Sequence, residues 1–214
     1  MLDELRLSCL NCRGCGLHER RTTVVFGEGD PNSPLMLIGE GPGDNEDKTG
    51  RPFVGRAGQL LDKAIRDAGI SREQVYITNT VKCRAADWST GRPMNRAPMD
   101  EEVEACRKWL LRQIDFIKPK VILCIGAPSA KNLIKRNFKI TQERGLFFQS
   151  DFAKTIMATL HPSYILRNMS ASGSDGGYSL LVHDIAKAWD AAQKLIEKER
   201  LKAMPPPVLQ DGLF

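Results

Sequence analysis

The chain has 214 residues, of which 42% are hydrophobic, and a formal net charge of +5 at pH 7. A chain of this size can bury one substantial core, so we expect a single domain over residues 1–200 and a short tail over residues 201–214. No apolar run approaches the roughly 20 residues that span a membrane, and the opening residues MLDELRLS have no secretory pattern, so we expect a cytoplasmic protein without a membrane partner.

Cysteines recur at every third position near the start of the chain, at Cys9, Cys12 and Cys15. The sequence contains six cysteines, and in a reducing compartment these are better interpreted as metal ligands or core residues than as disulfides. A Cys-x2-Cys pair brings two thiolates to one metal site across a tight turn. The three cysteines therefore offer two such pairs.

The stretch from Leu35 to Gly58 is the one around which we expect the rest of the chain to be organised. Its first four residues, LMLI, form a continuous apolar run that predicts a strand buried on both faces of a parallel sheet. The loop GEGPGDNED follows at the C-terminal end of that strand, where ligands usually bind, and its glycines let a ligand approach the backbone. Glu40 and Glu46 lie among further acids in this loop, which argues against a polyphosphate ligand.

Three more apolar runs with strand character follow, separated by segments with helical periodicity. We expect strands over residues 35–38, 75–81, 121–125 and 154–160, and helices over residues 60–68, 100–117, 126–134 and 180–198. Four strand–helix alternations predict an α/β fold, with a central four-stranded parallel sheet covered by helices on both faces. The strands then end on one edge, which brings Glu40, Asn79, Gly126 and His161 to one crevice.

Between these elements, residues 84–98 are polar and broken by Gly91, Pro93 and Pro98, so we expect a loop there. Cys124 lies within an expected strand and is interpreted as a small core residue. A basic cluster suits a polyanionic partner but is also common on solvated surfaces, so charge alone leaves nucleic-acid binding open. This cluster consists of Lys131, Lys135, Arg136, Lys139 and Arg144.

With these elements in place, the chain resembles the iron–sulfur uracil-DNA glycosylases, the type 4 branch of the uracil-DNA glycosylase superfamily, over nearly its whole length. The matching motifs are the Cys12–Cys15 pair followed by LHE, then GEGPGDNEDKTGRPFVGRAGQLL, ITNTVKC, NRAP with the downstream Cys106, and HPSYILR. The long second motif and HPSYILR are specific, whereas the cysteine pair alone is not. The resemblance implies a monofunctional base excision repair enzyme that flips uracil out of double- or single-stranded DNA, hydrolyses its N-glycosidic bond and leaves an abasic site.

The resemblance also implies a metal cofactor. It implies a [4Fe–4S] cluster held by Cys12, Cys15, Cys83 and Cys106, which leaves Cys9 and Cys124 free. The residues alone leave a structural zinc site open as the alternative, because four thiolates suit either metal.

Three side chains take roles in the uracil pocket by the same resemblance. Phe53 is placed like the ring that stacks on the extruded uracil, and Asn79 like the amide that donates to uracil O4 and accepts from N3–H. Cytosine presents the reverse pattern at these positions. His161 is placed like the histidine that binds uracil O2, where negative charge grows as the glycosidic bond breaks. The remaining implied contacts are Gly41 in the uracil pocket, and Ser163 and Arg167 on DNA.

The chain departs from the best-known uracil glycosylases at Gly41, where their motif has a water-directing aspartate. Glu40 and Glu46 are the candidates to orient water or to stabilise the sugar cation, and Glu46 is also a candidate to exclude the 5-methyl group of thymine. The interval between Cys83 and Cys106 also contains the apparent extra loop ADWSTGRPM, which either adds a DNA contact or is neutral, and we favour the neutral interpretation.

Two rival functions remain open at this point. One is a covalent uracil-DNA trapping relative, which uses a histidine in a basic inserted loop; residues 140–145 read ITQERG here, without that histidine. The other is a non-enzymatic, metal-containing nucleic-acid-binding module, which would not explain the convergence of Asn79, Phe53 and His161. We expect a monomer that works on the nucleoid.

The tail contains a possible partner motif. Residues Gln210 to Phe214 read QDGLF and resemble the short peptide by which bacterial repair proteins dock on the sliding clamp, and Pro205 to Pro207 form a stiff spacer before them. The alternative is an idle tail or one that docks on the body of the protein.

Overall fold

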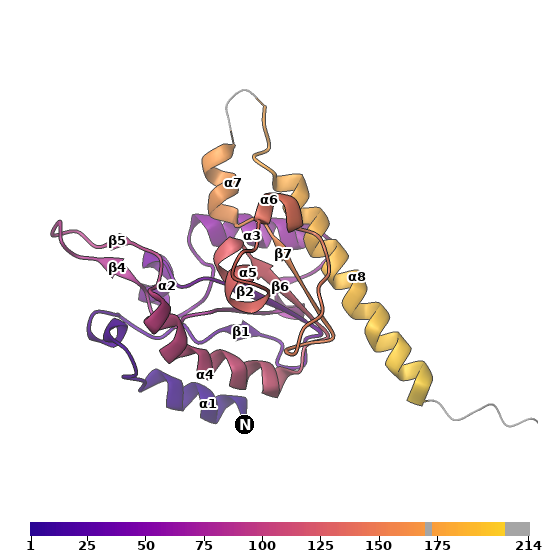
Figure 1. Cartoon of the computed structure of the whole chain (residues 1–214), viewed down its shortest axis with the longest axis horizontal. Coiled ribbons are helices and arrows are strands. Elements are labelled where there is room, and N and C mark those ends of the chain that lie inside the picture. The colour runs from indigo at the N-terminus through magenta and orange to yellow at the C-terminus, as the bar shows by residue number, and fades with distance from the viewer. Residues whose placement is uncertain (170–172, 204–214) are drawn as a thin grey trace, which may run out of the picture.

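The structure is a computed structural model that describes residues 1–169 and 173–203 (Figure 1). Its centre is a five-stranded sheet with the strand order β1-β3-β2-β6-β7. The four strands from β3 to β7 in this order run parallel, with Leu37 paired to Ile77 on one side and to Leu123 on the other. The strands are β1 (Glu28–Gly29), β2 (Leu35–Gly39), β3 (Tyr76–Asn79), β6 (Val121–Ile125) and β7 (Thr155–Thr159).

The four predicted strands are confirmed, but the prediction of a four-stranded, wholly parallel sheet is wrong. β1 adds an antiparallel edge, with Glu28 opposite Ile77 and Gly29 opposite Tyr76. The close pairing depends on glycine, because a Cβ at Gly29 would lie 1.9 Å from the Val75 carbonyl oxygen. A strand of two residues shows no periodicity, so the sequence pattern does not reveal it.

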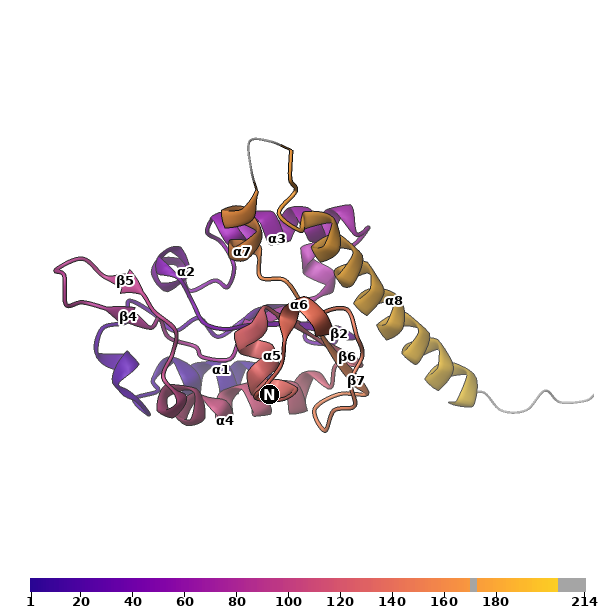
Figure 2. The same ribbon diagram turned by 45° about the horizontal axis from the view of Figure 1, so that its top comes forward.

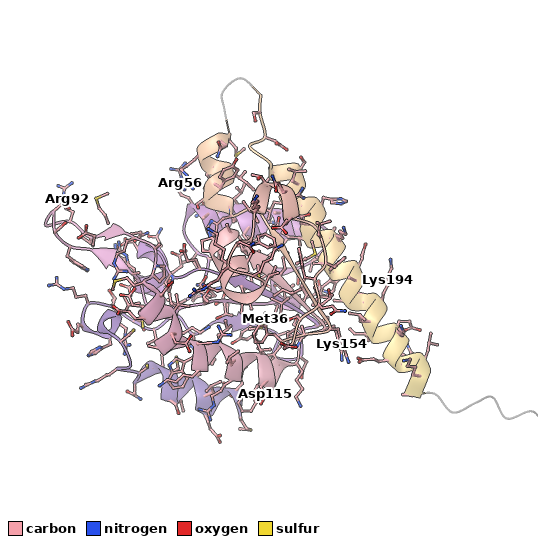
Figure 3. The ribbon with its side chains drawn as sticks, in the orientation of Figure 1. Met36, Arg56, Arg92, Asp115, Lys154 and Lys194 are labelled. Atoms are coloured by element: carbon pink, nitrogen blue, oxygen red, sulfur yellow. The ribbon has the colours of Figure 1, made fainter. Side chains whose placement is uncertain are left out.

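Helices cover both faces of the sheet, as predicted. Figures 1 and 2 show α1 (Leu2–Leu10) and α4 (Asp100–Ile117) on one side, and α3 (Arg56–Asp67), α7 (Pro162–Asn168) and α8 (Tyr178–Ala203) on the other. Alternate strand residues enter the two layers, so β2 sends Leu35 and Leu37 to the second side and Met36 and Ile38 to the first. Figure 3 shows Met36 in this interior. The shorter helices are α2 (Asp44–Thr49), α5 (Ala127–Leu133) and α6 (Ile140–Glu143), with 3-10 turns η1 (Gly16–Glu19) and η2 (Arg72–Gln74).

The loop expected over residues 84–98 is a hairpin instead. β4 (Ala86–Asp87) pairs antiparallel with β5 (Met94–Asn95), and the chain turns through Gly91 at φ 76°. The hairpin projects from the body, with Arg92 at its far end (Figures 1 and 3). Arg84 attaches its base to α2 by an ion pair of 2.6 Å with Asp44, and it also donates to Asn95 of β5 at 2.7 Å. Two-residue strands again lie below what sequence periodicity resolves.

Three further sequence predictions concern the tail, membrane spans and a core cysteine. The helix α8 continues to Ala203, and the predicted clamp peptide Gln210 to Phe214 lies outside the described residues. Among the described helices, none has the length and apolar composition needed to cross a membrane. Cys124 is fully buried in the core beside α4, as predicted for a core residue.

Candidate active site

A cavity of about 620 Å³ opens where the parallel strands end. Its wall comes from the loop after β2, the end of β3, the segment before α4 and the start of α7. The structure thus brings together side chains that are distant in the sequence. All the non-cysteine residues predicted for the site line this cavity, namely Glu40, Gly41, Glu46, Phe53, Asn79, His161, Ser163 and Arg167.

Asn79 ends β3 and presents a buried amide to the cavity. The residue is only 2% exposed, yet its side-chain amide has no hydrogen-bond partner among residues 1–169 and 173–203. Buried amides are almost always paired, so an unpaired one that faces a cavity is typical of a ligand site. Gly39 leaves room for it, because a Cβ there would lie 2.4 Å from Asn79 Oδ1 and 2.5 Å from Phe53 Cζ.

Phe53 forms an adjoining wall in an unusual backbone conformation. Its φ is 51°, a left-handed value that bulky residues rarely adopt, and its ring centroid lies 6.0 Å from that of His161. Two contacts hold this turn. Arg72 donates to the Pro52 carbonyl at 2.6 Å and to the Phe53 carbonyl at 3.4 Å. Gly58 packs beneath, where a Cβ would lie 1.9 Å from the Phe53 carbonyl oxygen.

Glu46 is committed to backbone contacts within the acidic loop. One carboxylate oxygen accepts from the N–H groups of Val54 and Gly55, both at 2.8 Å, and the other accepts from Gly43 N–H at 3.1 Å. The carboxylate therefore ties the start of α2 to the turn after Phe53. This arrangement fixes the loop and leaves Glu46 few free lone pairs for a ligand.

Glu40 differs from Glu46 in its surroundings. Its backbone carbonyl accepts from Val81 N–H at 3.1 Å, whereas its carboxylate has no hydrogen-bond partner among the described residues. Burial raises the pKa of Glu40 above its ordinary value. A half-buried carboxylate that lacks protein partners at a cavity wall is available to hold water.

His161 caps the N-terminus of α7, and this contact fixes its tautomer. Its Nδ1 accepts from the Ser163 backbone N–H at 3.1 Å and lies 2.7 Å from Ser163 Oγ. A backbone N–H only donates, so Nδ1 carries no proton and the neutral ring holds its proton on Nε2. Burial, with a smaller contribution from Arg167, lowers the pKa of His161 to about 4. The ring is therefore neutral at pH 7. Gly126 packs against it, since a Cβ there would lie 2.9 Å from the His161 Cβ.

The predicted metal ligands gather at a second place, a small hollow that we call the cysteine hollow. Cys12 and Cys15 reach it from the turn between α1 and η1, Cys83 from the segment after β3, and Cys106 from α4. Cys9 also lines it, and none of the six cysteines forms a disulfide. The side chains within residues 1–169 and 173–203 form no group of three or more His, Cys, Asp or Glu arranged around a single metal ion.

The donor set around the cysteine hollow suits bound thiolates. Cys12 Sγ accepts from Trp109 Nε1 at 3.2 Å, Cys106 Sγ from Lys82 backbone N–H at 3.2 Å, and Cys83 Sγ from Arg21 at 3.4 Å. N–H donors to sulfur stabilise thiolates and adjust the potential of iron–sulfur sites. The four cysteines and their donors therefore fit a thiolate-bound metal group.

Comparison with known proteins agrees with this geometry. The family model described as "Uracil DNA glycosylase superfamily" matches residues 26–191. A type-4 uracil-DNA glycosylase of Thermotoga maritima is 48% identical over 160 residues, which cover 74% of this chain and 80% of that protein. The chain belongs to the uracil-DNA glycosylase superfamily. A type-4 enzyme of Pyrobaculum aerophilum is 41% identical over 80% of this chain and 88% of that protein, whereas a type-5 enzyme of the same organism is 32% identical over 50% of each.

Gly41, where the chain departs from the motif of the best-known uracil glycosylases, is sterically confined in the candidate site. A Cβ at Gly41 would lie 2.7 Å from Val81 Cγ2. A side chain there would therefore require Val81 to move.

Sequence reasoning missed three cations that lie close to the candidate site. Arg72 holds the turn at Phe53 and pairs with Glu28 and Asp62. Arg84 ties the hairpin to α2, as described above. Lys82 is fully buried between Asn79 and the cysteine hollow, and burial lowers its pKa to about 8. A usable signal existed only for Lys82, which lies within the motif ITNTVKC.

Acidification is expected to destabilise this protein through His161. The pKa of the ring falls from 6.5 to about 4 on folding, so its contribution to stability is complete above pH 6.5 and is lost as the pH falls toward 4. Between pH 7.5 and 5.5 this loss is about 1.4 kcal/mol. Urea unfolding under anaerobic conditions measures it, because His161→Gln should lose that much less stability than the wild type over the same interval. Equal losses in both proteins would contradict the assignment.

Proposed function

We propose that the protein is a monofunctional uracil-DNA glycosylase that draws a flipped uracil into the cavity and hydrolyses its N-glycosidic bond, which begins base excision repair. The observation that carries the proposal is the Asn79 amide, which is buried and unpaired within the described part of the chain, in a cavity that Phe53 and His161 also line. The names of the type-4 relatives support the same activity.

Base recognition depends on Asn79, which contacts the edge of the base, and on Phe53, which contacts its face. The Asn79 amide donates to uracil O4 and accepts from N3–H, so cytosine, with the opposite pattern, leaves both groups unsatisfied unless the amide flips. Phe53 stacks on the extruded base, and its held backbone means that little ordering is required when the base arrives.

Bond cleavage depends on a neutral donor. As the N1–C1′ bond breaks, its electron pair moves into the uracil ring and negative charge gathers on O2. His161 Nε2–H donates to that oxygen, because Ser163 keeps Nδ1 as an acceptor and the proton on Nε2. We thus assign Ser163 a positioning role toward His161, in addition to its predicted place near DNA.

Water attack completes the reaction. We assign Glu40 to orient the water whose oxygen bonds to C1′ and whose proton leaves through the carboxylate to solvent, because Glu40 has no competing protein partner among the described residues. Glu46 instead holds the loop through its three backbone contacts. The sequence alone left these two roles unseparated.

DNA reaches the cavity past exposed cations. Arg56 on α3, labelled in Figure 3, and Arg167 on α7 line its rim, and neither forms an ion pair with a carboxylate of the described residues. Such cations suit phosphates on either side of the extruded nucleotide. We propose uracil in double- or single-stranded DNA as the substrate, and a monomer that acts in the cytoplasm on the nucleoid.

A single incubation tests the activity. An oligonucleotide with one uracil should yield free uracil and an abasic site with many turnovers, and an identical strand with thymine should yield neither. A denaturation-resistant protein–DNA adduct would instead indicate the covalent trapping function. Binding without product would indicate a nucleic-acid-binding module.

We further propose that Cys12, Cys15, Cys83 and Cys106 hold a [4Fe–4S] cluster. When bound, this group supplies iron–thiolate bonds that tie the N-terminal turn to the segment after β3 and to α4. In tetrahedral zinc all four thiolates surround one ion, whereas in a cluster each binds a different iron. The resemblance to the iron–sulfur glycosylases supports the cluster, and a single zinc ion on the same four cysteines is the alternative.

Metal content tests this assignment. Anaerobically purified protein should be brown and contain iron, and Cys106→Ala should lose iron and stability because a tie between distant segments is removed. The matched control is Cys124→Ala, which also removes a buried sulfur but lies in the core away from the cysteine hollow and should retain iron. Colourless protein with stoichiometric zinc would contradict the cluster. We expect Cys9→Ala to retain iron as well.

We also propose that the tail, whose predicted motif lies outside the described residues, docks on the sliding clamp. Deleting Gln210 to Phe214 should leave uracil excision from short oligonucleotides unchanged and should abolish a weak, roughly micromolar interaction with the clamp, as expected of one short peptide. Calorimetric titration of clamp with each protein measures this. Undiminished binding after the deletion, or none in the intact chain, would contradict the proposal.

A further inference from the structure

Lys82 is a buried cation between the candidate uracil pocket and the cysteine hollow. The residue is 1% exposed, and its Nζ donates to Thr78 Oγ1 at 2.6 Å and to the Asn79 carbonyl at 2.7 Å. Both acceptors are neutral. Within residues 1–169 and 173–203 no carboxylate lies within 4.0 Å of this ammonium.

A buried ammonium without a counter-charge is costly. Removing such an ion from water costs several kcal/mol even after the surrounding protein relaxes, and neutral acceptors offset only part of this. Buried lysines are therefore nearly always paired. The position of Lys82 requires a negative charge that the carboxylates of the described chain do not supply.

The cysteine hollow lies where that charge is needed. Lys82 lines it together with Cys9, Cys83 and Cys106, and its own backbone N–H donates to Cys106 Sγ at 3.2 Å. Protonated thiols carry no charge. Four thiolates around an iron–sulfur cluster, or around zinc, carry a net negative charge, so either metal group would compensate Lys82.

Lys82 also contacts Asn79, the residue assigned to read the base. β3 ends at Asn79. The next residues are fixed to the end of β2 and the loop after it, since Thr80 N–H donates to the Gly39 carbonyl at 2.9 Å and Val81 N–H to the Glu40 carbonyl at 3.1 Å. Lys82 then holds the Asn79 carbonyl from within the protein. The peptide that carries the uracil-reading amide is thus attached to the wall of the cysteine hollow.

We propose that Lys82 is a positioning residue that serves as the internal counter-charge of the metal group and holds Asn79 in place, so that an occupied cysteine site favours a uracil-binding pocket. The inference rests on the proposed function and extends it. Lys82 itself touches neither the base nor the sugar. Its two tasks are separable, because one requires positive charge and the other requires only an N–H donor.

Two variants separate the tasks. Lys82→Met removes both the charge and the donor, whereas Lys82→Gln removes the charge and keeps an N–H donor for Asn79. Both variants should release metal to a chelator about tenfold or more faster than wild type, as loss of outer-shell partners typically does. For an iron–sulfur cluster both should also show a more negative midpoint potential, because loss of a nearby cation disfavours the reduced form. Unchanged metal release and potential would overturn the counter-charge.

Kinetics tests the second task. Lys82→Met should raise KM for uracil-containing DNA about fivefold or more, whereas Lys82→Gln should keep KM close to the wild-type value. In an Asn79→Ala background, Lys82→Met should add little, because the group that it positions is gone. An additive effect in the double variant, or equal KM values for Met and Gln, would overturn the link to Asn79.

The outcomes distinguish the role proposed for Lys82 from the proposed uracil excision and from the proposed metal cofactor. Metal release needs no DNA, so it reports on Lys82 even if the protein fails to excise uracil. Wild-type protein that holds no metal after anaerobic purification and reconstitution would overturn the counter-charge together with the cofactor, and would leave excision standing. A folded sample of either Lys82 variant is sufficient for the metal measurements.

Discussion

Replacing His161 with alanine is expected to slow uracil excision by about 10²- to 10³-fold, as loss of one preorganised donor to a developing oxyanion usually does. The ring is neutral and its Nδ1 is held by Ser163, so Nε2–H is already directed when the base arrives. The charge on O2 develops only as the bond breaks, so the loss should fall on the chemical step more than on binding. Single-turnover kinetics with saturating enzyme measures that step.

Two substitutions provide the controls for this measurement. His183→Ala removes an exposed histidine on α8, away from the cavity, and should leave the rate unchanged. Ser163→Ala removes the hydroxyl but keeps the backbone N–H that Nδ1 accepts, so the rate should fall by less than about tenfold. A His161→Ala variant within tenfold of wild type would contradict the role assigned to His161.

Part of the candidate site could be predicted from the sequence because Asn79 ends a strand and Glu40 and His161 lie just after strands. The segment Val121–Ile125 coincides with its predicted strand, and once the parallel sheet is inferred, Asn79 and His161 must meet at one edge. The resemblance then supplied Phe53, whose place in a loop has no periodicity to reveal it. The local hydrophobic pattern of the sequence shows where each strand ends. The parallel arrangement of the strands then brings these ends to one edge of the sheet.

The finer division of roles could not be predicted, because it depends on partners that only folding brings together. Glu40 and Glu46 are the same residue type in the same acidic loop, and they differ because the N–H groups of Val54 and Gly55 fold back onto Glu46 alone. Arg72 gave no signal for a similar reason. A long cationic side chain reaches whichever carbonyls the tertiary structure places near it, here those of Pro52 and Phe53.

The short antiparallel elements were missed for a different reason. β1 and the hairpin of β4 and β5 have two residues in each strand, so no alternation can be detected. Their pairing is nevertheless specific, and the hairpin places Asn95 and Arg96 on the wall of the cavity. We predicted a neutral loop here, and the structure shows an ordered hairpin at the candidate site whose effect on DNA binding stays a prediction.

Replacing Asn79 with aspartate is expected to reduce uracil excision by about 10²-fold or more, because sites that read a base by paired hydrogen bonds discriminate strongly when one pair is lost. An ionised aspartate cannot donate to uracil O4, and it places a negative charge in a position that is 2% exposed. When protonated, the carboxylic acid donates toward the position where cytosine N3 accepts. The base preference should therefore shift from uracil toward cytosine as activity falls.

The alanine variant shows whether that shift comes from hydrogen bonding. Asn79→Ala removes donor and acceptor together, so it should lose uracil excision to a similar extent and gain nothing on cytosine. Both variants keep the backbone carbonyl that Lys82 Nζ contacts, so a difference between them reports on the side chain rather than on the end of β3. Excision of uracil, cytosine and thymine from otherwise identical oligonucleotides provides the comparison. Full activity with unchanged base preference in both variants would show that Asn79 does not read the base.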